Sequence, residues 1–376
     1  MKTKLREKIY KKIGKFPKTI RGGISNVIYL NEKRRLSGIK TPAHMIFYIT
    51  DKCNLKCSHC FYWRHINKKT DEMSLGQIKK VIRSLKNRLE SVVITGGEPF
   101  LRKEIFEICK YFERYNKTKK IIIATNATLP ETVYEKVNLI LKKTNLDLDI
   151  QISLDGLEKT HDEIRGVHGS FQNVIKTVNK LKKLKMNGNF NVSISTTISK
   201  KNIAEIPALM DFVQKELKEF HGLQIMRNSK LHSFNVPKEI LSDFDSQEKI
   251  LGLKEIKAIL EKINEKKTNK NDPLLDRITE IFNEYMIEIL EKKKPLLKCR
   301  AGKIDGVVYS NGNVAMCEFT KSFAQLKDYN YDFYKLWNSN KAKRMREKIS
   351  CCFCIHPCNL ITSMRSDRKA LKKIFN

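Results

Sequence analysis

The chain has 376 residues, of which 41% are hydrophobic and 31% are charged, and its net charge is +33. This length predicts two or three domains, and the composition excludes a small disulfide-framed scaffold and an intrinsically disordered chain. Lysine supplies 57 of the 74 basic residues, which leaves open both a polyanion-binding surface and a bias of genome composition. The sequence contains no run of 18 apolar residues and no secretory signal, so we expect a cytoplasmic protein whose ten cysteines serve metal or redox chemistry.

The first 40 residues are predicted to form a basic N-terminal arm with a net charge of +11. Ile9, Ile13 and Phe16 recur at nearly helical spacing among the lysines, a pattern typical of a helix that lies on an anionic membrane surface. A solvated arm that packs these side chains on the protein body fits the same pattern. Peripheral contact with a membrane surface therefore stays open beside a purely cytoplasmic location.

After the arm, short apolar runs alternate with longer helical patterns. Strands are predicted near 44–50, 91–95, 120–125, 147–154, 190–197 and 222–226, with helices near 74–88, 102–115, 130–143, 171–186 and 202–217 between them. Right-handed βα units wind one way into a parallel barrel, and six units are too few for a closed eightfold barrel. The predicted fold class is α/β, with a partial (β/α)6 barrel whose chemistry sits on loops after the strands.

The rest of the chain changes character twice. Lys- and Glu-rich helical patterns over 254–268 and 274–293 predict a helical connector or lid. A small Cys-rich hairpin-plus-helix module follows, whose hairpin turns at Asn311-Gly312. The predicted domains are the basic arm (1–40), the barrel (41–230), the connector (231–298), the Cys-rich module (299–360) and a basic tail (361–376).

Three cysteines, Cys53, Cys57 and Cys60, follow the first predicted strand. Thiolate is the standard ligand of iron–sulfur clusters, and three thiolates leave one iron of a [4Fe–4S] cluster free to bind a substrate or cofactor. Zinc held by these thiols and His59 is the alternative, although adjacent His59 and Cys60 can hardly share one tetrahedral ion. The spacing therefore favours a cluster with one open iron.

A second motif, Thr95-Gly96-Gly97-Glu98-Pro99, follows the second predicted strand. Glycine lets the backbone approach a ligand closely, and Glu98 can accept hydrogen bonds from a cationic amino group. Both motifs, in this order, resemble those of the radical S-adenosylmethionine (radical SAM) superfamily over roughly residues 41–230. The resemblance implies that the open iron binds SAM, whose reductive cleavage gives a 5′-deoxyadenosyl radical that abstracts a hydrogen atom from substrate. It also implies cofactor contacts at Gly96, Gly97, Glu98 and Pro99, and a reducing partner such as flavodoxin or ferredoxin.

Three later segments are similar to cofactor-binding segments of the same superfamily. Asn126 lies in a Thr-Asn-Ala sequence where the family has Thr-Asn-Gly, and Ala127 leaves the local backbone geometry open. Ser153 and Asp155 match a ribose-contacting segment, and the resemblance implies that Arg165 lies near the SAM carboxylate. A turn-capping role for Asp155 and a surface ion pair for Arg165 are the structural alternatives.

Six of the ten cysteines gather in the last fifth of the chain. They resemble the SPASM and twitch type of auxiliary domain, which holds further iron–sulfur clusters, and six cysteines support one auxiliary [4Fe–4S] cluster. Structural zinc is the alternative. Adjacent Cys351 and Cys352 can hardly ligate the same cluster. The preferred ligands are Cys299, Cys317, Cys354 and Cys358, with Cys352 or Cys351 as a substitute.

The expected function is hydrogen abstraction from a small-molecule, sugar or lipid-linked substrate, with the auxiliary cluster aiding oxidation or substrate binding. Forty residues before the barrel are too few for a peptide-recognition domain, which makes a peptide-modifying maturase the alternative. A tRNA-modifying enzyme is less favoured, because the sequence has no aromatic-interleaved Arg motif or RNA-binding module. Nucleic acid is therefore not an expected partner.

Overall fold

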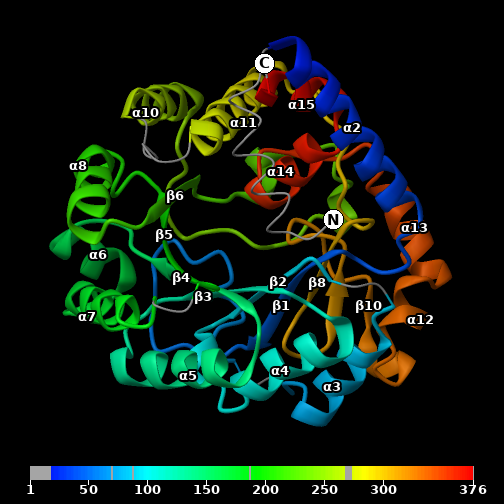
Figure 1. Ribbon diagram of the computed structural model, residues 1–376, viewed down its shortest axis with the longest axis horizontal. Coiled ribbons are helices and arrows are strands. Elements are labelled where there is room, and N and C mark those ends of the chain that lie inside the picture. The colour runs from blue at the N-terminus through cyan, green and yellow to red at the C-terminus, as the bar shows by residue number, and fades with distance from the viewer. Residues whose placement is uncertain (1–17, 69–70, 87–88, 186–187, 267–272, 376) are drawn as a thin grey trace.

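The computed structural model describes residues 18–375 except 69–70, 87–88, 186–187 and 267–272. Ile9, Ile13 and Phe16 of the predicted basic helix lie outside the described residues. The first described element is α2 (Lys18–Ser37), which packs against α15 (Arg368–Phe375) at the rim of the molecule (Figure 1). Among the described helices, none combines the length and the apolar character that crossing a membrane would require.

The described residues form a central sheet with the strand order β10-β9-β8-β1-β2-β3-β4-β5-β6. Its strands β1 to β6 pair in parallel and follow the chain order, as right-handed βα units predict. β6 and β10 are the two edges of the sheet, so the barrel is open and the predicted fold class is confirmed. The parallel strands are β1 (His44–Thr50), β2 (Ser91–Gly96), β3 (Lys120–Thr125), β4 (Asp147–Ser153), β5 (Phe190–Ile198) and β6 (Phe220–Ile225).

Amphipathic helices cover the outer face of the sheet (Figure 1). Burial alternates along β3 and β4, and one set of their apolar side chains packs against the buried stripes of these helices. A short helix, α6, was not predicted, because its eight residues bury only His161, Ile164 and Arg165. The helices are α3 (Leu75–Ser84), α4 (Ile105–Asn116), α5 (Pro130–Lys143), α6 (Glu158–Arg165), α7 (Ser170–Lys182) and α8 (Ile206–Phe212), which a π-helical turn, η2 (Val213–Leu217), extends.

A second apolar core lies beside the barrel. It joins α10 (Leu253–Lys266) and α11 (Pro273–Lys292), which match the two helices predicted for the connector, to α14 (Pro357–Arg365) and α15. The basic tail is therefore a packed helix whose Leu371 and Ile374 are buried. The remaining helices are η1 (Pro99–Leu101), α9 (Ser229–His232), η3 (Lys238–Ile240), η4 (Leu326–Tyr329), α12 (Phe333–Trp337) and α13 (Asn340–Lys348).

The predicted hairpin extends the barrel sheet. β8 (Asp305–Val308) pairs in parallel with β1, and β9 (Asn313–Ala315) and β10 (Ala324–Gln325) follow it antiparallel. Gly312 turns the hairpin with a φ of +86°, a left-handed conformation that glycine adopts without strain. A separate pair, β7 (Ser233–Phe234) and β11 (Phe353–Cys354), ties the last cysteines to the segment after the barrel.

Candidate functional site

The loop after β1 carries Cys53, Cys57 and Cys60, and its backbone is tied at several points. The side chain of Asn67 accepts a hydrogen bond from the Cys53 amide at 2.9 Å and donates one to its carbonyl at 2.8 Å. The Ser58 amide donates to the carbonyl of Ile164 in α6 at 2.9 Å. The three thiols, all partly buried, are thus held beside the ends of β1 and α6.

The three thiols suit a [4Fe–4S] cluster by donor chemistry, and all three lie on one loop. Burial raises the pKa of Cys53 to about 12 and that of Cys60 to about 11, and the neighbouring Cys57 contributes in the same direction. Ligation would therefore release protons from this loop. Within the described residues, no three Cys, His, Asp or Glu side chains converge closely enough to surround a single metal ion.

Gly96 and Gly97 pack directly against the backbone that leads into the cysteine loop. A Cβ atom on Gly96 would lie 2.1 Å from the Thr50 carbonyl oxygen, and one on Gly97 would lie 2.1 Å from the Lys52 carbonyl oxygen. The amides of Gly97 and Glu98 donate to these same two oxygens at 2.8 Å. Glycine is needed here because the end of β2 approaches the start of the cysteine loop.

Glu98 is buried and joins the ends of β2 and β3. Its carboxylate accepts hydrogen bonds from the Thr125 hydroxyl at 2.8 Å, the Asn126 amide at 2.8 Å and the Phe100 amide at 3.0 Å. Burial outweighs these contacts and raises the pKa of Glu98. Pro99 begins η1, where its missing N–H leaves no donor unsatisfied.

Asn126 connects the end of β3 to the cysteine loop. Its side-chain amide donates to Asn54 Oδ1 at 2.9 Å, and its own Oδ1 accepts from Thr128 Oγ1 at 2.7 Å. Ala127 adopts a φ of +54°, a left-handed conformation that glycine adopts without the penalty that a Cβ atom brings. The backbone geometry that the Thr-Asn-Ala sequence left open is therefore left-handed at Ala127.

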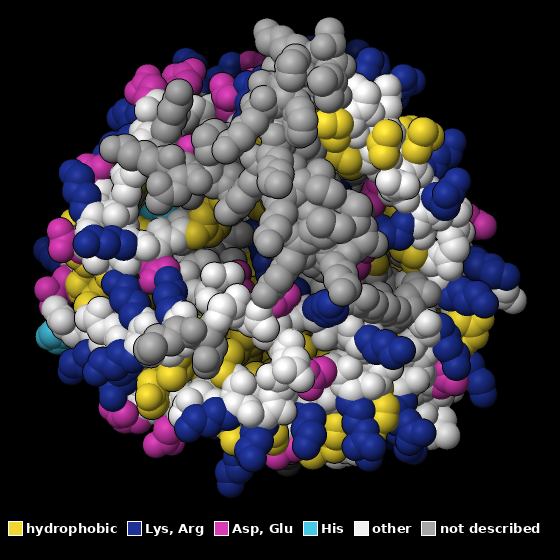
Figure 2. Space-filling model, viewed as in Figure 1, with side chains coloured by type: hydrophobic (Ala, Val, Ile, Leu, Met, Phe, Trp, Pro, Cys, Tyr) yellow, Lys and Arg dark blue, Asp and Glu magenta, His cyan; other side chains and the backbone are white. Residues whose placement is uncertain are grey.

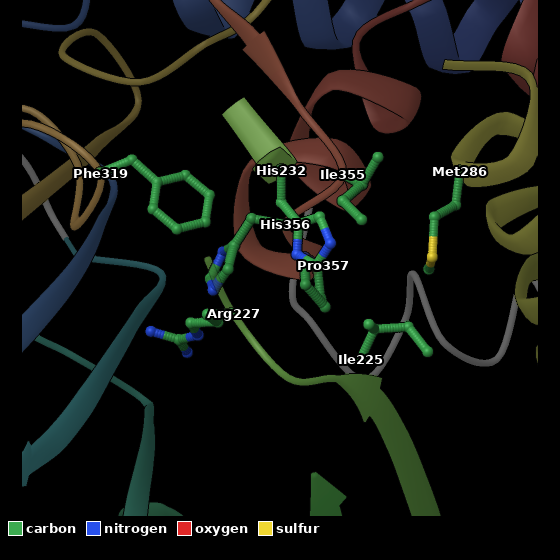
Figure 3. Close-up of a pocket in the computed structure, with 8 residues that line it drawn as sticks. All are labelled: Ile225, Arg227, His232, Met286, Phe319, Ile355, His356 and Pro357. Carbon is green, nitrogen blue, oxygen red and sulfur yellow. The ribbon is translucent and has the colours of Figure 1, made fainter. Parts of the chain in front are cut away.

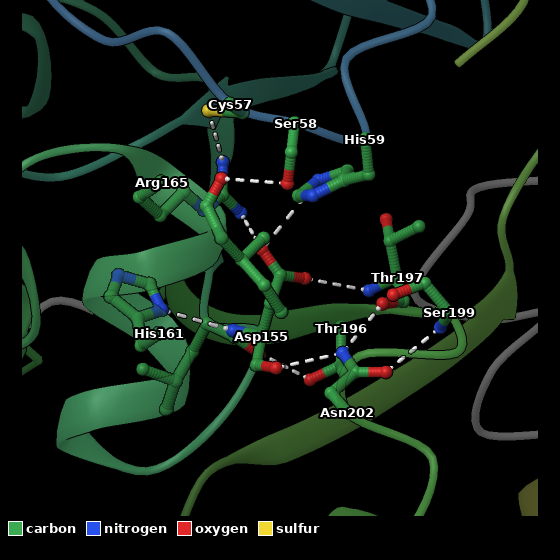
Figure 4. A network of polar contacts seen from close by, with 12 residues as sticks. Cys57, Ser58, His59, Asp155, His161, Arg165, Thr196, Thr197, Ser199 and Asn202 are labelled. Carbon is green, nitrogen blue, oxygen red and sulfur yellow. Dashed lines mark hydrogen bonds and ion pairs between the residues drawn. The ribbon is translucent and has the colours of Figure 1, made fainter. Parts of the chain in front are cut away.

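Asp155 and Arg165 form a buried ion pair between β4 and α6 (Figure 4). Asp155 also accepts a hydrogen bond from the Thr197 amide at 2.8 Å, and His59 Nε2 lies 3.7 Å from its Oδ2. Burial alone would raise the pKa of Asp155, but Arg165 and then His59 outweigh it and lower that pKa. Arg165 Nη1 also donates to Cys57 Sγ at 3.6 Å. A cation thus lies between a cysteine of the loop and a carboxylate at the end of β4.

Ser153 ends β4, two residues before Asp155 in the sequence, and is half-buried. The structure therefore gathers every site residue predicted in the barrel at the carboxyl ends of the parallel strands, where such folds place their chemistry. Asn202 was not singled out from the sequence. Its side chain donates to the carbonyls of Asp155 at 2.7 Å and Thr197 at 2.9 Å, and thereby fixes the loop that carries Asp155.

Four of the C-terminal cysteines, Cys299, Cys317, Cys352 and Cys354, line one pocket. The charge of Cys299 contributes to the raised pKa values of Cys317, Cys352 and Cys354, as expected for thiols that lie near one another. Cys358 does not line this pocket; it lies near Glu318 and Arg227. The pocket thus holds the substitute Cys352 together with the other three thiols, while the charge of Cys358 contributes to the raised pKa of Cys354, which places Cys358 near that thiol as well.

Arg227 and Glu318 were not singled out from the sequence, and they form a second ion pair near Cys358. Their positions in the sequence could have indicated a role at the site, since Arg227 comes two residues after β6 and Glu318 directly follows Cys317. Side chains after the ends of parallel strands are the first candidates for a functional site. The cavity beside Arg227 is lined by Ile225, Arg227, His232, Met286, Phe319, Ile355, His356 and Pro357 (Figure 3).

Comparison with known proteins places these features in a family. Residues 47–213 match the model of the radical SAM superfamily. The chain is 30% identical to GTP 3′,8-cyclase of Clostridium botulinum over 230 residues. This alignment covers 59% of this chain and 70% of that protein. The chain is 36% identical to the subtilosin biosynthesis protein AlbA of Bacillus subtilis over 168 residues. This alignment covers 44% of this chain and 35% of AlbA. The chain spans about half or less of the length of several curated relatives, including the Fe-coproporphyrin III synthase of Methanosarcina barkeri, of which it covers 45%.

Two solved structures share the fold over most of their length. Streptococcus suis SuiB bound to the precursor peptide SuiA has a TM-score of 0.57 at 20% identity and covers 83% of this chain and 68% of SuiB. The enzyme anSMEcpe with bound AdoMet and a peptide has a TM-score of 0.55 at 17% identity, covering 80% of this chain and 82% of that one. Both likenesses reach beyond the barrel into the C-terminal third. With its Cys-x3-Cys-x2-Cys loop and a SPASM/twitch-like Cys-rich region, the chain belongs to the radical SAM superfamily.

Proposed function

We propose that this protein reductively cleaves SAM and abstracts a hydrogen atom from its substrate, with Cys53, Cys57 and Cys60 as the ligands of the first cluster. The observation that carries this proposal is the position of the three thiols, on a loop held against the Gly96-Gly97 turn and the Asp155–Arg165 pair. When bound, the [4Fe–4S] cluster and SAM supply the one-electron cleavage that gives the 5′-deoxyadenosyl radical. The protein's own residues bind and orient these groups.

The barrel residues divide this work by position. Gly96 and Gly97 set the entry of the cysteine loop, and Glu98, Pro99 and Asn126 brace the adjoining strand ends. Ser153 offers its hydroxyl to the ribose, and Asp155 holds Arg165 through their ion pair. Arg165 can then exchange part of this pairing for the carboxylate of bound SAM, because a guanidinium carries five donors.

An auxiliary [4Fe–4S] cluster is proposed at Cys299, Cys317, Cys354 and one further thiol. The shared pocket supports Cys352 as the fourth ligand, while the sequence spacing favours Cys358. Cys352→Ser and Cys358→Ser separate these alternatives. If Cys352 is the ligand, its variant alone loses the auxiliary EPR signal after anaerobic reconstitution, and the Cys358 variant keeps it. The reverse result assigns the fourth position to Cys358.

Release of 5′-deoxyadenosine tests the proposed reaction. With dithionite and SAM, the reconstituted protein should release this product even without substrate, because uncoupled cleavage needs only the first cluster and the barrel contacts. A Cys354→Ala/Cys358→Ala variant should keep this cleavage and lose conversion of the true substrate much more severely. No deoxyadenosine from protein with a filled first cluster would refute the proposal.

The substrate class has two candidates. A small-molecule, sugar or lipid-linked substrate is the first, and relatives named GTP 3′,8-cyclase and AdoMet-dependent heme synthase are consistent with a small molecule. A peptide is the second, supported by AlbA and by the two peptide-bound structures that share the fold with this chain. Deuterium transfer from a labelled candidate into 5′-deoxyadenosine distinguishes them, since only the true substrate delivers its hydrogen atom.

The proposed partners are a reductant such as flavodoxin or ferredoxin and, through the basic N-terminal segment, an anionic membrane surface. Lys and Arg side chains are spread around the face shown in Figure 2 and do not form a single patch there. Near the N-terminus, Val27 and Leu30 of α2 are 58% and 60% exposed. The packed neighbour α15 presents the exposed basic residues Arg368, Lys369, Lys372 and Lys373. Exposed apolar and basic side chains on adjacent helices are the combination that binds anionic lipid surfaces.

A further inference from the structure

The ion pair of Arg227 and Glu318 lies between the segments that carry the two groups of cysteines. Arg227 Nη1 donates to Glu318 Oε2 at 2.7 Å, and both side chains are largely buried. Burial disfavours the charged guanidinium, but Glu318 outweighs this effect and raises the pKa of Arg227. The pair is therefore a fixed cation and anion inside the protein.

Each member of the pair is close to one of the two segments that carry cysteines. Arg227 contacts the first cysteine loop, and Glu318 is the neighbour of Cys317 in the sequence. The guanidinium of Arg227 lies 4.3 Å from the ring centroid of Phe61, the residue after Cys60. Glu318 directly follows Cys317 in the sequence. One cation–π contact and one ion pair thus connect the first cysteine loop to the second cysteine group.

A third contact ties Glu318 to the barrel itself. The Tyr48 hydroxyl, from β1, donates to Glu318 Oε1 at 2.5 Å. Tyr48 also packs on Tyr62 of the first cysteine loop, with ring centroids 4.9 Å apart. His356, which lies between Cys354 and Cys358, brings its Nε2 to 3.9 Å from Glu318 Oε2. Glu318 is therefore the point where β1, the end of β6 and the C-terminal cysteines meet.

The charges of the pair extend to the second cysteine group. Glu318 directly follows Cys317, and its Oε2 is 3.9 Å from Nε2 of His356, which stands between Cys354 and Cys358. The paired charges of Arg227 and Glu318 therefore lie beside the second cysteine group. The two residues act with opposite sign on any charge that resides among these cysteines.

We propose that Arg227 and Glu318 are positioning residues that hold the two cluster-binding segments together and shift the reduction potential of the auxiliary cluster in opposite directions. This inference rests on the proposed function, because it requires both clusters. Reduction adds one negative charge to a cluster, and nearby charge is among the factors that set its potential. Arg227 favours the reduced form, whereas Glu318 disfavours it.

An EPR-monitored redox titration of the reconstituted protein tests the proposal. Arg227→Gln should shift the auxiliary midpoint potential to a more negative value, and Glu318→Gln should shift it to a more positive value. The double variant should return towards the wild-type value, because it removes both charges. Arg227→Lys keeps the charge and should keep the wild-type potential while loosening the contact with Phe61.

The matched control is the surface pair of Lys180 and Glu131 on α7 and α5, whose Nζ and Oε2 are 2.8 Å apart. Lys180→Gln and Glu131→Gln should leave both midpoint potentials unchanged. The proposal is overturned if Arg227→Gln and Glu318→Gln retain their iron and shift the auxiliary potential in the same direction or not at all. If Arg227→Gln does not fold, Glu318→Gln decides alone. A positive shift of the auxiliary midpoint potential supports the proposal, and a negative shift or none overturns it. A wild-type protein without the second EPR signal would instead refute the proposed auxiliary cluster.

Discussion

Gly97→Ala tests whether the end of β2 must lie against the start of the cysteine loop. The added Cβ would meet the Lys52 carbonyl oxygen at 2.1 Å and its carbonyl carbon at 2.5 Å. Both are backbone atoms, so no side chain can rotate away, and the strand end or the loop must move. That movement strains two hydrogen bonds of 2.8 Å, from the Gly97 amide to Thr50 and from the Glu98 amide to Lys52.

The expected cost is the sum of overpacking and weakened hydrogen bonds, about 2 to 5 kcal/mol in the free energy of unfolding. Because Lys52 precedes Cys53, the same movement should lower the iron retained after anaerobic reconstitution. The matched control is Gly76→Ala in α3, where the nearest heavy atom to a new Cβ is 3.9 Å away. Alanine there should stabilise the helix by about 0.5 to 1 kcal/mol.

Urea unfolding of the two variants beside the wild type measures both effects, and iron assay of the same samples measures the effect on the loop. A Gly97→Ala protein with wild-type stability and full iron would refute the reasoning. In that case the strand end would have room for a side chain, and the glycine pair would serve some purpose other than close backbone packing.

Three further predictions follow from other parts of the structure. Replacing Cys53, Cys57 and Cys60 together by Ala should remove about half of the roughly eight irons expected for two [4Fe–4S] clusters, and full iron in that variant would contradict the ligand assignment. His221 is buried in β6 and burial lowers its pKa to about 4, so its contribution to stability is complete above about pH 6.5 and is lost as the pH falls towards 4. Urea titrations at pH 7 and pH 4.5 measure how much the free energy of unfolding falls between these two pH values. His221→Gln should reduce this fall by up to about 3 kcal/mol, and the same fall in the variant and the wild type would contradict the role of His221. The protein should sediment with anionic and not with neutral vesicles, less so at high salt, and Leu30→Ser should weaken this binding; equal binding to both vesicle types would exclude the membrane surface as a partner.

Local periodicity was enough to predict the repeated βα units. β3 occupies the predicted residues 120–125, and α5 occupies the predicted residues 130–143. Alternating burial along a strand and a 3.6-residue apolar stripe along a helix are short-range patterns, so the sequence displays them directly. The short helix α6 was not predicted, because its eight residues are too few for such a stripe to repeat.

Pairing between distant segments could not be predicted in this way. The hairpin and its turn at Gly312 were visible in the sequence, but the parallel pairing of His44 with Asp305 was not. The strand propensity of 305–308 is equally compatible with a separate small sheet. Only the packing of the whole chain decides which strand edge it extends.

For the glycine pair and for the polar site residues, the sequence indicated the type of contact, and the structure identified the partner. The sequence indicated that Gly96 and Gly97 allow a close approach, and the structure identifies the approaching group as the backbone of Thr50 and Lys52. Asp155 and Arg165 were assigned separate cofactor contacts, and the structure pairs them with each other. A residue type defines what a side chain can bind, whereas its partner depends on where α6 returns to the sheet.

The sequence by itself determined the chemistry of the site, because three thiols at Cys53, Cys57 and Cys60 define a ligand type whatever surrounds them. It also determined the family and the order of the barrel elements. Only the tertiary structure decided that Cys352 shares a pocket with Cys299 and that Arg227 meets Glu318 across 91 residues. The physical reason is that ligand chemistry is a property of single side chains, whereas proximity between distant residues results from the packing of all the elements that lie between them.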